Sequence, residues 1–557
     1  MEPKSPSKLK LPALGYFHHF TVLKITIITV TVILLILTGY YLFYNPRFAT
    51  NTSYFTVVLD CGSSGTRVNI YEWMLKDSLL ADKDSKLPIL LHSYPDKSTK
   101  IDDFKDGCAY HCMQTEPGLD KFVGNASGVK SSIEPLIRRA EKWVPYERRK
   151  DTPIFVLATA GLRRLSTDAA NEVLDDVESI VKLHDFKYKK DWIRILSGEE
   201  EAYYGWLALN HHMGIFGNSS KLPTLGLLDL GGSSLQVATE TREPILDVHV
   251  SFKSKIGAFE HQIMAVSLPA FGLNEGFDRT VVMLSKSLVF VDRELGSFEI
   301  GHPCLRFGFM QNYTCYGCFK GNSSRYMREN EFLVLNLVGK PNWEKCKVLA
   351  RAAATNSSSI SDRSKRSDDS YCTGPSSVNG EMNLNLFGGT HSVSRFHALS
   401  GFYAVYKLLN LNSSTTISKI WEKGEELCSR SLAGLTNMSI NQKYAELLCF
   451  RVPYIVSLIE KTVCVGNKDI VFGPRDISWT LGAALVEGKN LWLSDTFRAQ
   501  SIVSNLTLTR VILSPYFLFV LLAFLLFVVY RSQIKLPMLG RKVTSIPPYI
   551  NSKRSPA

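Results

Sequence analysis

The sequence predicts an α/β protein of two similar lobes, with one membrane-spanning helix on either side of them. Three observations predict it. Strand-like apolar runs alternate with amphipathic helical stretches through the middle of the chain. An aspartate followed by glycine and serine residues, between two apolar strands, occurs at Asp60 and again at Asp229. Two uncharged apolar runs, 25–44 and 511–530, enclose this region.

The outermost elements are these two apolar runs and the basic tails beyond them. Each run has 20 residues, enough to cross about 30 Å of hydrocarbon as a helix. Residues 1–24 carry a net charge of +3 and residues 531–557 carry +6, out of +12 for the chain of 557 residues. Because basic flanks stay in the cytosol, we predict two cytosolic tails around a lumenal or extracellular region. A signal-anchor is favoured for the first run over a cleaved signal peptide, whose apolar part is shorter.

The charge, cysteines and sequons agree with this topology. Since the basic residues gather in the tails, nucleic acid is not expected as a partner. All eleven cysteines lie between the spans, and the ten other than Cys61 could form five disulfides in an oxidising compartment. Cys315-x-x-Cys318 could be half of a zinc site, but no second half follows it. The predicted glycosylation sites are Asn51, Asn125, Asn218, Asn312, Asn322, Asn356, Asn412, Asn437 and Asn505.

The elements between the spans follow in order. Residues 152–165 (TPIFVLATAGLRRL) are predicted to form a strand, a turn and a helix, and residues 192–210 repeat that form. Residues 223–240 read as strand, glycine turn and strand. Residues 354–380 are rich in serine and charge, which is typical of a surface loop.

The two glycine-serine turns can bind phosphate. Successive backbone N–H groups in such a turn form an anion site, and glycine lets a phosphate oxygen approach the backbone. Asp60 and Asp229, directly before the turns, would repel phosphate unless a divalent cation lay between them. Ca²⁺ and Mg²⁺ take oxygen ligands, and Mg²⁺ usually keeps several waters. One such hairpin alone is more simply an ordinary turn; the matching pair favours two phosphate sites around a hydrated cation.

Three adjacent glutamates open the helix predicted after residue 197. Ser197 and Glu200 have the spacing of a capping box, which gives Glu200 a structural task. Glu201 remains as a carboxylate at a rigid helix start, a placement that suits a general base. Spacing alone leaves both glutamates open as the base. The predicted buried stripe of the helix is Ala202, Trp206, Leu209 and Met213.

Three reactive side chains near these motifs are given no catalytic role. Cys61 is predicted to be a buried small residue, because phosphoryl transfer to water needs no thiolate. His211 and His212 lack metal-ligand spacing and are predicted to lie at the surface.

Five segments, in order, resemble the signature segments of the apyrase, or ecto-nucleoside triphosphate diphosphohydrolase, family. They are Asp60–Arg67, Ala158–Arg163, Ser197–Trp206, Asp229–Gln236 and Trp479–Ala484. The resemblance implies an actin-like fold of two lobes, each with an RNase H-like core. By analogy, lobe I would be 54–195 with a return at 467–500, and lobe II would be 196–466. It also implies a membrane-bound location, at the cell surface or in the Golgi and other endomembranes.

The resemblance assigns roles to particular residues. Glu201 would be the catalytic base, and Asp60 and Asp229 would align a Ca²⁺ or Mg²⁺ ion through water. The phosphate- and nucleotide-binding positions would be Ser63, Ser64, Thr66, Thr159, Ala160, Arg163, Gly231, Gly232, Ser233, Ser234, Gln236 and Trp479. The first turn departs from several cell-surface members, since it has Gly65 where they have histidine, which favours the endomembrane type.

The predicted function is divalent-cation-dependent hydrolysis of the terminal phosphate of nucleoside tri- or diphosphates, by direct attack of water. The expected partners are the nucleotide and the membrane; the sequence gives no oligomeric state and no base preference. One alternative is a catalytically inactive nucleotide-binding glycoprotein. Another is a phosphohydrolase or kinase of the actin-like superfamily that acts on a different substrate.

Overall fold

The structure is a computed structural model in which Thr52–Trp492 form one compact unit and the two terminal segments form another. The residues described are 29–30, 32–34, 53–74, 88–94, 113–217, 222–241, 249–256, 259–286, 298–315, 333–355, 393–412, 415–429, 446–475, 477–488, 519–524 and 527.

The first sheet has the strand order β3-β2-β1-β5-β6, with β4 beside β2. Its strands are β1 (Ser53–Gly62), β2 (Gly65–Met74), β3 (Ile89–Tyr94), β4 (Gln114–Thr115), β5 (Ile154–Ala158) and β6 (Ile193–Ile195). The hairpin β1–β2 is antiparallel, as is β2–β3, whereas β5 runs parallel to both β1 and β6. Because both faces are covered, β1 is buried along nearly all its length rather than on alternate residues.

The second sheet has the order β15-β14-β7-β8-β10-β9. Its strands are β7 (Gly226–Leu230), β8 (Ser234–Glu240), β9 (Ser251–Ile256), β10 (Phe259–Pro269), β14 (Arg395–Ser400) and β15 (Asp469–Phe472). It repeats the plan of the first sheet: an antiparallel hairpin (β7–β8), a third antiparallel strand (β10), then two parallel strands (β14, β15) on the other side. The repeated hairpin predicted two similar lobes, and the structure has two mixed sheets built on the same plan.

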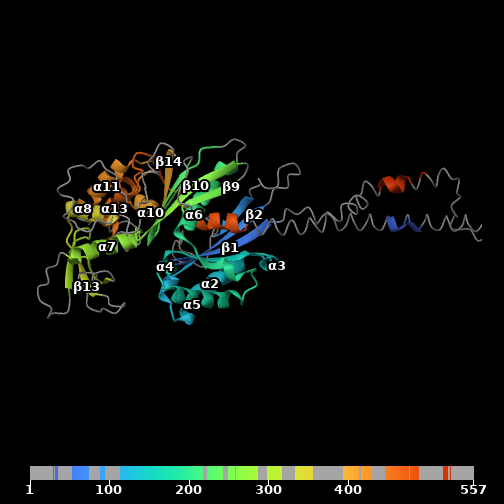
Figure 1. Ribbon diagram of the computed structural model, residues 1–557, viewed down its shortest axis with the longest axis horizontal. Helices are drawn as coiled ribbons and strands as arrows, with labels where there is room; N and C mark the ends of the chain where they lie inside the picture. The colour runs from blue at the N-terminus through green and yellow to red at the C-terminus, as the bar shows by residue number, and fades with distance from the viewer. Residues whose placement is uncertain are drawn as a thin grey trace, which may run out of the picture. The chain divides into compact units, whose positions relative to one another are not determined.

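Helices cover the outer faces of the two sheets (Figure 1). On the first sheet, α2 and α5 pack against the apolar side chains of β1 and β5. On the second, α7, α8, α10 and α13 bury the other large core. The helices are α2 (Ala126–Trp143), α3 (Tyr146–Arg149), α4 (Ala160–Arg163), α5 (Thr167–Val181), α6 (Gly198–His212), α7 (Leu273–Lys286), α8 (Trp343–Ala354), α10 (Gly401–Leu408), α11 (Ile417–Ser429) and α13 (Leu448–Ser457), with short turns η3 (Leu119–Lys121), η4 (Lys190–Trp192), η5 (Ile215–Gly217) and η7 (Leu458–Thr462).

A middle layer lies between the two sheets. It consists of α6 and a helix at 479–488, whose buried side chains contact both sheets in one apolar cluster. Tyr71 on β2 and Thr480 share a buried hydrogen bond of 2.7 Å between their hydroxyl groups. The helix at 479–488 therefore joins the first sheet to α6 at the end of the chain.

The middle layer explains two differences from the sequence predictions. Residues Ala202–Asn210 of α6 are buried all the way round, so the helix has no polar stripe; Met213, predicted in the buried stripe, is 43% exposed at the helix end. His211 is partly buried and packs edge-on against Trp73 at 6.1 Å between ring centroids, so its predicted surface position is wrong. The exposed position of His212 is confirmed.

The C-terminal boundary also differs from the prediction. The return to lobe I was expected from residue 467, but β15 pairs with β14 in the second sheet. The return therefore begins after Phe472. The predicted strand–turn–helix units at 152–165 and 192–210, and the hairpin at 223–240, are confirmed by β5–α4, β6–α6 and β7–β8.

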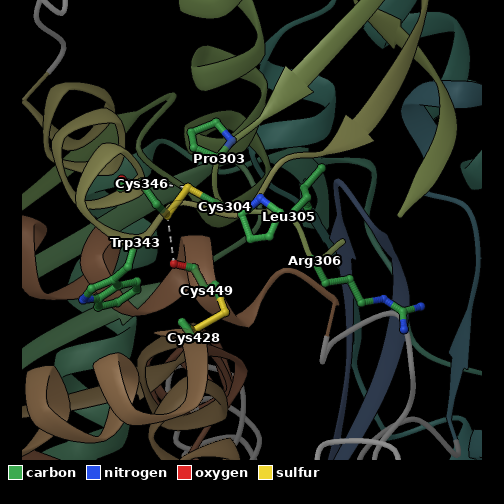
Figure 2. A pocket seen from close by; sticks show the side chains of 9 residues that line it. Pro303, Cys304, Leu305, Arg306, Trp343, Cys346, Cys428 and Cys449 are labelled. Atoms are coloured by element: carbon green, nitrogen blue, oxygen red, sulfur yellow. Dashed lines mark hydrogen bonds between the residues drawn. A yellow bond between two sulfur atoms is a disulfide. The ribbon is translucent and has the colours of Figure 1, made fainter. Parts of the chain in front are cut away.

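A small sheet of β11 (Phe298–His302), β13 (Leu333–Gly339) and β12 (Met310–Cys315) lies beside α7 and α8. Two disulfides join the elements around it, Cys304–Cys346 and Cys428–Cys449, and the sulfur of Cys346 lies 3.2 Å from the carbonyl of Cys449. Figure 2 shows the pocket that these cysteines line together with Trp343. None of the predicted site residues lines this pocket. Cys61 is buried and free, as predicted.

His302, the last residue of β11, is held as a neutral imidazole. The backbone N–H of Cys304 donates to its Nδ1 (3.1 Å), so the proton is on Nε2, which donates to Thr280 Oγ1 (2.8 Å). The Thr280 hydroxyl in turn donates to the carbonyl of Phe277 at 2.6 Å. Burial lowers the pKa of His302 to about 3.

The buried histidine predicts a loss of stability in acid. An unfolded histidine titrates near pH 6.5, so the unfolded state binds a proton below that pH while folded His302 does not. Between pH 6.5 and 3, this group should lower the free energy of unfolding by about 1.4 kcal/mol per pH unit. We expect His302→Gln to be less stable at pH 7 but to lose about 2 kcal/mol less between pH 7 and pH 5. Denaturant titrations at several pH values would give the free energy of unfolding of both proteins. An equal dependence of this free energy on pH in the two proteins would contradict the prediction.

The predicted membrane spans and the loop 354–380 fall almost wholly outside the described residues. Of 25–44, residues 29–30 and 32–34 are described, and of 511–530, residues 519–524 and 527; all are helical. Within these described stretches no helix reaches the length and apolar character needed to cross a bilayer.

Candidate active site

The first glycine-serine turn joins β1 to β2. The strands pair without a break up to Gly62 opposite Gly65, which leaves Ser63 and Ser64 as a two-residue turn. Asp60 lies opposite Arg67 in the ladder, and the two side chains form an ion pair of 3.5 Å. The Asp60 carboxylate is therefore held at the end of a rigid strand, next to the turn.

The second turn joins β7 to β8 with the same register. Asp229 lies opposite Gln236, as Asp60 lies opposite Arg67, and the N–H of Gly231 donates to the carbonyl of Ser234 at 3.0 Å. The start of α7 supports this turn, because the N–H groups of Leu273 and Asn274 donate to its two glycine carbonyls at 3.0 and 2.9 Å.

The two turns face each other closely. A Cβ atom placed on Gly232 would lie 3.5 Å from Ser63 Oγ and 3.0 Å from Asn274 Nδ2. A Cβ on Gly272 would lie 2.3 Å from the backbone of Gly232, which no side chain could tolerate. Only glycine fits at position 272, where α7 supports the turn. Because Gly232 also has no side chain, the two turns can lie close together.

The glutamates at the start of α6 are separated by the structure. Ser197 and Glu200 form the predicted capping box: Ser197 Oγ accepts from the Glu200 N–H (3.0 Å) and Glu200 Oε2 accepts from the Ser197 N–H (2.9 Å). Glu201 takes no part in the capping box. Its side chain is only 12% exposed and accepts from Arg163 Nη2 at 2.6 Å.

Glu201, Asp60 and Asp229 influence one another electrostatically. Burial raises the pKa of Glu201 to about 8; Arg163 opposes the rise, and Asp60 and Asp229 add to it. Burial raises the pKa of Asp60 to about 6, against Arg67 and with a contribution from Asp229. Burial also raises the pKa of Asp229. The three buried carboxylates are thus electrostatically coupled, and Arg67 and Arg163 oppose the rise in the pKa of Asp60 and Glu201.

This donor set fits a hard cation held through water. Carboxylate oxygens suit Ca²⁺ and Mg²⁺, and a divalent charge would compensate the mutual repulsion of Asp60 and Asp229. Within the part of the chain that the structure describes, no three His, Cys, Asp or Glu side chains gather closely enough to hold a metal directly. A cation here would keep most of its own water ligands.

Comparisons with known proteins show the family to which the chain belongs. Residues 47–500 match the GDA1/CD39 (nucleoside phosphatase) family. The chain belongs to this family. It is similar to "Probable apyrase 7" of Arabidopsis thaliana, with 37% identity over 450 residues that cover 80% of this chain and 58% of that protein. The chain thus spans less than two thirds of that relative.

Two further comparisons bear on the family and the fold. The "Guanosine-diphosphatase" of Saccharomyces cerevisiae is 25% identical over 77% of this chain and 79% of its own length. The crystal structure of nucleoside triphosphate hydrolases from Neospora caninum matches with a TM-score of 0.52 at 15% identity, and covers 80% of this chain and 95% of that one. The α/β fold with two mixed sheets is therefore that of a known nucleoside triphosphate hydrolase.

The remaining predicted site residues of this family member have different surroundings. Gln236 Nε2 donates to Ser234 Oγ at 2.7 Å, so these two lie together, whereas the Ser233 hydroxyl is directed to Glu275 (3.4 Å). Ser64 is exposed at the tip of its turn, and Thr66 is fully buried on β2. Buried Thr159 precedes Ala160, the first residue of α4. Trp479 is 6% exposed and packs in the middle layer.

Sequence reasoning missed Ser400. This residue ends β14 next to Leu230 of β7, and its side chain hydrogen-bonds Asp229. Ser400 has a φ of 50°, which is uncommon outside glycine. Residues 395–400 have the apolar character of a strand, and Ser400 stands at its carboxyl end. Because the carboxyl ends of neighbouring parallel strands meet at one edge of a sheet, this position could have been predicted to lie near Asp229.

Proposed function

We propose that this chain hydrolyses the terminal phosphate of nucleoside di- and triphosphates, with Glu201 as the general base and a Ca²⁺ or Mg²⁺ ion held through water by Asp60 and Asp229. The observation that supports it most is the close approach of two glycine-serine turns, each directly preceded by a buried aspartate, with the buried Glu201 electrostatically coupled to both aspartates. Membership of a nucleoside phosphatase family, and relatives named apyrase and guanosine-diphosphatase, support the substrate class.

The proposed chemistry needs no phosphoenzyme. Glu201, oriented by Arg163, removes a proton from water, whose oxygen attacks the terminal phosphorus while the bond to the leaving nucleotide breaks. Gln236 and Ser234, which contact each other, position that water. Backbone N–H groups and hydroxyls of the two turns bind the phosphate oxygens as charge develops on them. The cation, when bound, neutralises further phosphate charge.

The finer features of the proposal concern fold and location. The repeated sheet plan supports an actin-like protein with an RNase H-like core in each lobe. The apolar runs at 25–44 and 511–530 would anchor it in the membrane, with Thr52–Trp492 in the lumen of an endomembrane compartment. The predicted glycosylation positions Asn125, Asn312 and Asn412 are exposed, as an acceptor must be.

A turnover panel tests the proposal. The purified full-length protein in detergent would be given ATP, ADP, UDP, GDP and polyphosphate, with Ca²⁺, with Mg²⁺ or with chelator. We expect phosphate release from nucleotides only, abolished by chelator and restored by adding the cation back. Release from polyphosphate alone would favour the alternative phosphohydrolase. Nucleotide binding without release from any substrate would favour the inactive glycoprotein.

A further inference from the structure

Two adjacent arginines stand at the end of α4, and each pairs with a glutamate in the first turn of another helix. Arg163 pairs with Glu201 of α6, which belongs to the site already described. Arg164 pairs with Glu275 of α7. The second pair joins the part of the chain that carries the first turn to the part that carries the second.

On the side of the first turn, Arg164 approaches a buried acid. Asp120 Oδ2 lies 3.8 Å from Arg164 Nη2 and 3.1 Å from Lys121 Nζ, and the Asp120 side chain is only 5% exposed. Asp120 lies under the turn: a Cβ atom placed on Gly118 would lie 2.6 Å from the carbonyl of Ser63 and 2.8 Å from Asp120 Oδ1. Arg164 thus approaches an acid that lies close to the first turn.

On the side of the second turn, Glu275 has two partners. Its Oε1 atom accepts a hydrogen bond from Arg164 Nη1 and another from the Ser233 hydroxyl at 3.4 Å. The backbone N–H of Glu275 is directed to the carbonyl of Gly232 at 3.4 Å, in the same helix start that supports this turn. A series of side-chain contacts thus leads from one turn to the other, through Asp120, Arg164, Glu275 and Ser233.

We propose that Arg164 is a positioning residue, which by pairing with Glu275 fixes the spacing of the two turns and thereby the KM for the nucleotide. This proposal rests on the proposed function of the turns. An ion pair this exposed (46% and 25% of the side chains) adds little to stability. Its effect is expected on the relative position of two phosphate sites, since small displacements of binding groups are costly to catalysis.

A double-mutant cycle tests the pairing. Arg164→Met keeps the aliphatic length, and Glu275→Gln keeps a hydrogen-bond acceptor for Ser233. We expect each to raise KM about fivefold, the factor that an ion pair of about 1 kcal/mol supplies. The double variant should lose no more than either single one, while kcat stays within about twofold. Arg395→Met is the matched control, because Arg395–Asp469 is an exposed pair within the second sheet; it should leave KM unchanged.

A second measurement separates this proposal from the proposed function. Hydrogen exchange of the backbone at 60–66 and 229–235, without nucleotide, should rise to the same extent in both single variants and in the double variant, and not in Arg395→Met. If the unchanged protein released no phosphate, the proposed function would fail while exchange still tested the pairing. Additive losses, a lowered KM, or unchanged exchange at both turns would overturn the positioning role.

Discussion

Replacing Glu201 with glutamine is expected to lower kcat by about 10²–10⁴-fold, the usual contribution of a general base. The melting temperature should stay close to that of the unchanged protein. Glutamine keeps the shape and can still accept from Arg163, but its amide cannot take the proton from water. Because burial of the Glu201 carboxylate is costly, a neutral side chain is tolerated in that position. Steady-state kinetics and thermal melting of the variant would measure both effects.

Glu200→Gln is the matched control. It changes the same chemical group one residue earlier, where the carboxylate completes the capping box and pairs with Arg194 at 2.9 Å. Glutamine can still complete a capping box, and the lost pair with Arg194 is about one-third exposed and worth at most about 1 kcal/mol. Activity should therefore be largely retained. An inactive Glu200→Gln beside an active Glu201→Gln would move the base to Glu200.

The second large effect is expected from Asp60→Asn and Asp229→Asn. Removing either carboxylate should weaken the apparent cation affinity in turnover by about 10–100-fold, as loss of an outer partner of a metal does. The double variant should show almost no cation-dependent turnover. Both acids are buried, and burial disfavours their charged forms, so the amides should leave the melting temperature without cation unchanged or raised.

The stability measurement makes this prediction specific. A cation that binds only the folded protein raises the melting temperature by mass action, and this rise should be present in the unchanged protein and absent from the double variant. Asp175→Asn, at an exposed carboxylate paired with Lys190, should behave like the unchanged protein. A variant of Asp60 or Asp229 that kept full turnover at low cation concentration would show that the two hairpins do not act as a pair.

The parts of the site that sequence reasoning predicted are local. The two hairpin turns and the capping box each involve residues fewer than ten positions apart, so turn and cap chemistry alone specify them. The repeated aspartate predicted the repeated sheet plan for the same reason: the register from Asp60 to Arg67 is the register from Asp229 to Gln236.

The parts that were missed depend on contacts between distant segments. Ser400 meets Asp229 only because β14 pairs with β7, and Arg164 meets Glu275 across 111 residues of sequence. The stripe predicted for α6 was wrong at Met213 because the helix ends at His212, so that Met213 lies beyond it and is exposed; the period of the stripe does not show where the helix ends. The boundary at residue 467 was misplaced because the pairing partner of a short strand cannot be read from its own residues.

The middle layer has a consequence for synthesis on the ribosome. Tyr71 and Thr480 are 409 residues apart, yet they share a buried hydrogen bond, and Trp73 and Phe155 belong to the same apolar cluster as Leu481. The first sheet is among the earliest parts of the chain to be synthesised. One of its faces is covered only after the helix at 479–488 has been made. A nascent chain that stops before residue 479 therefore lacks the helix that packs on that apolar face.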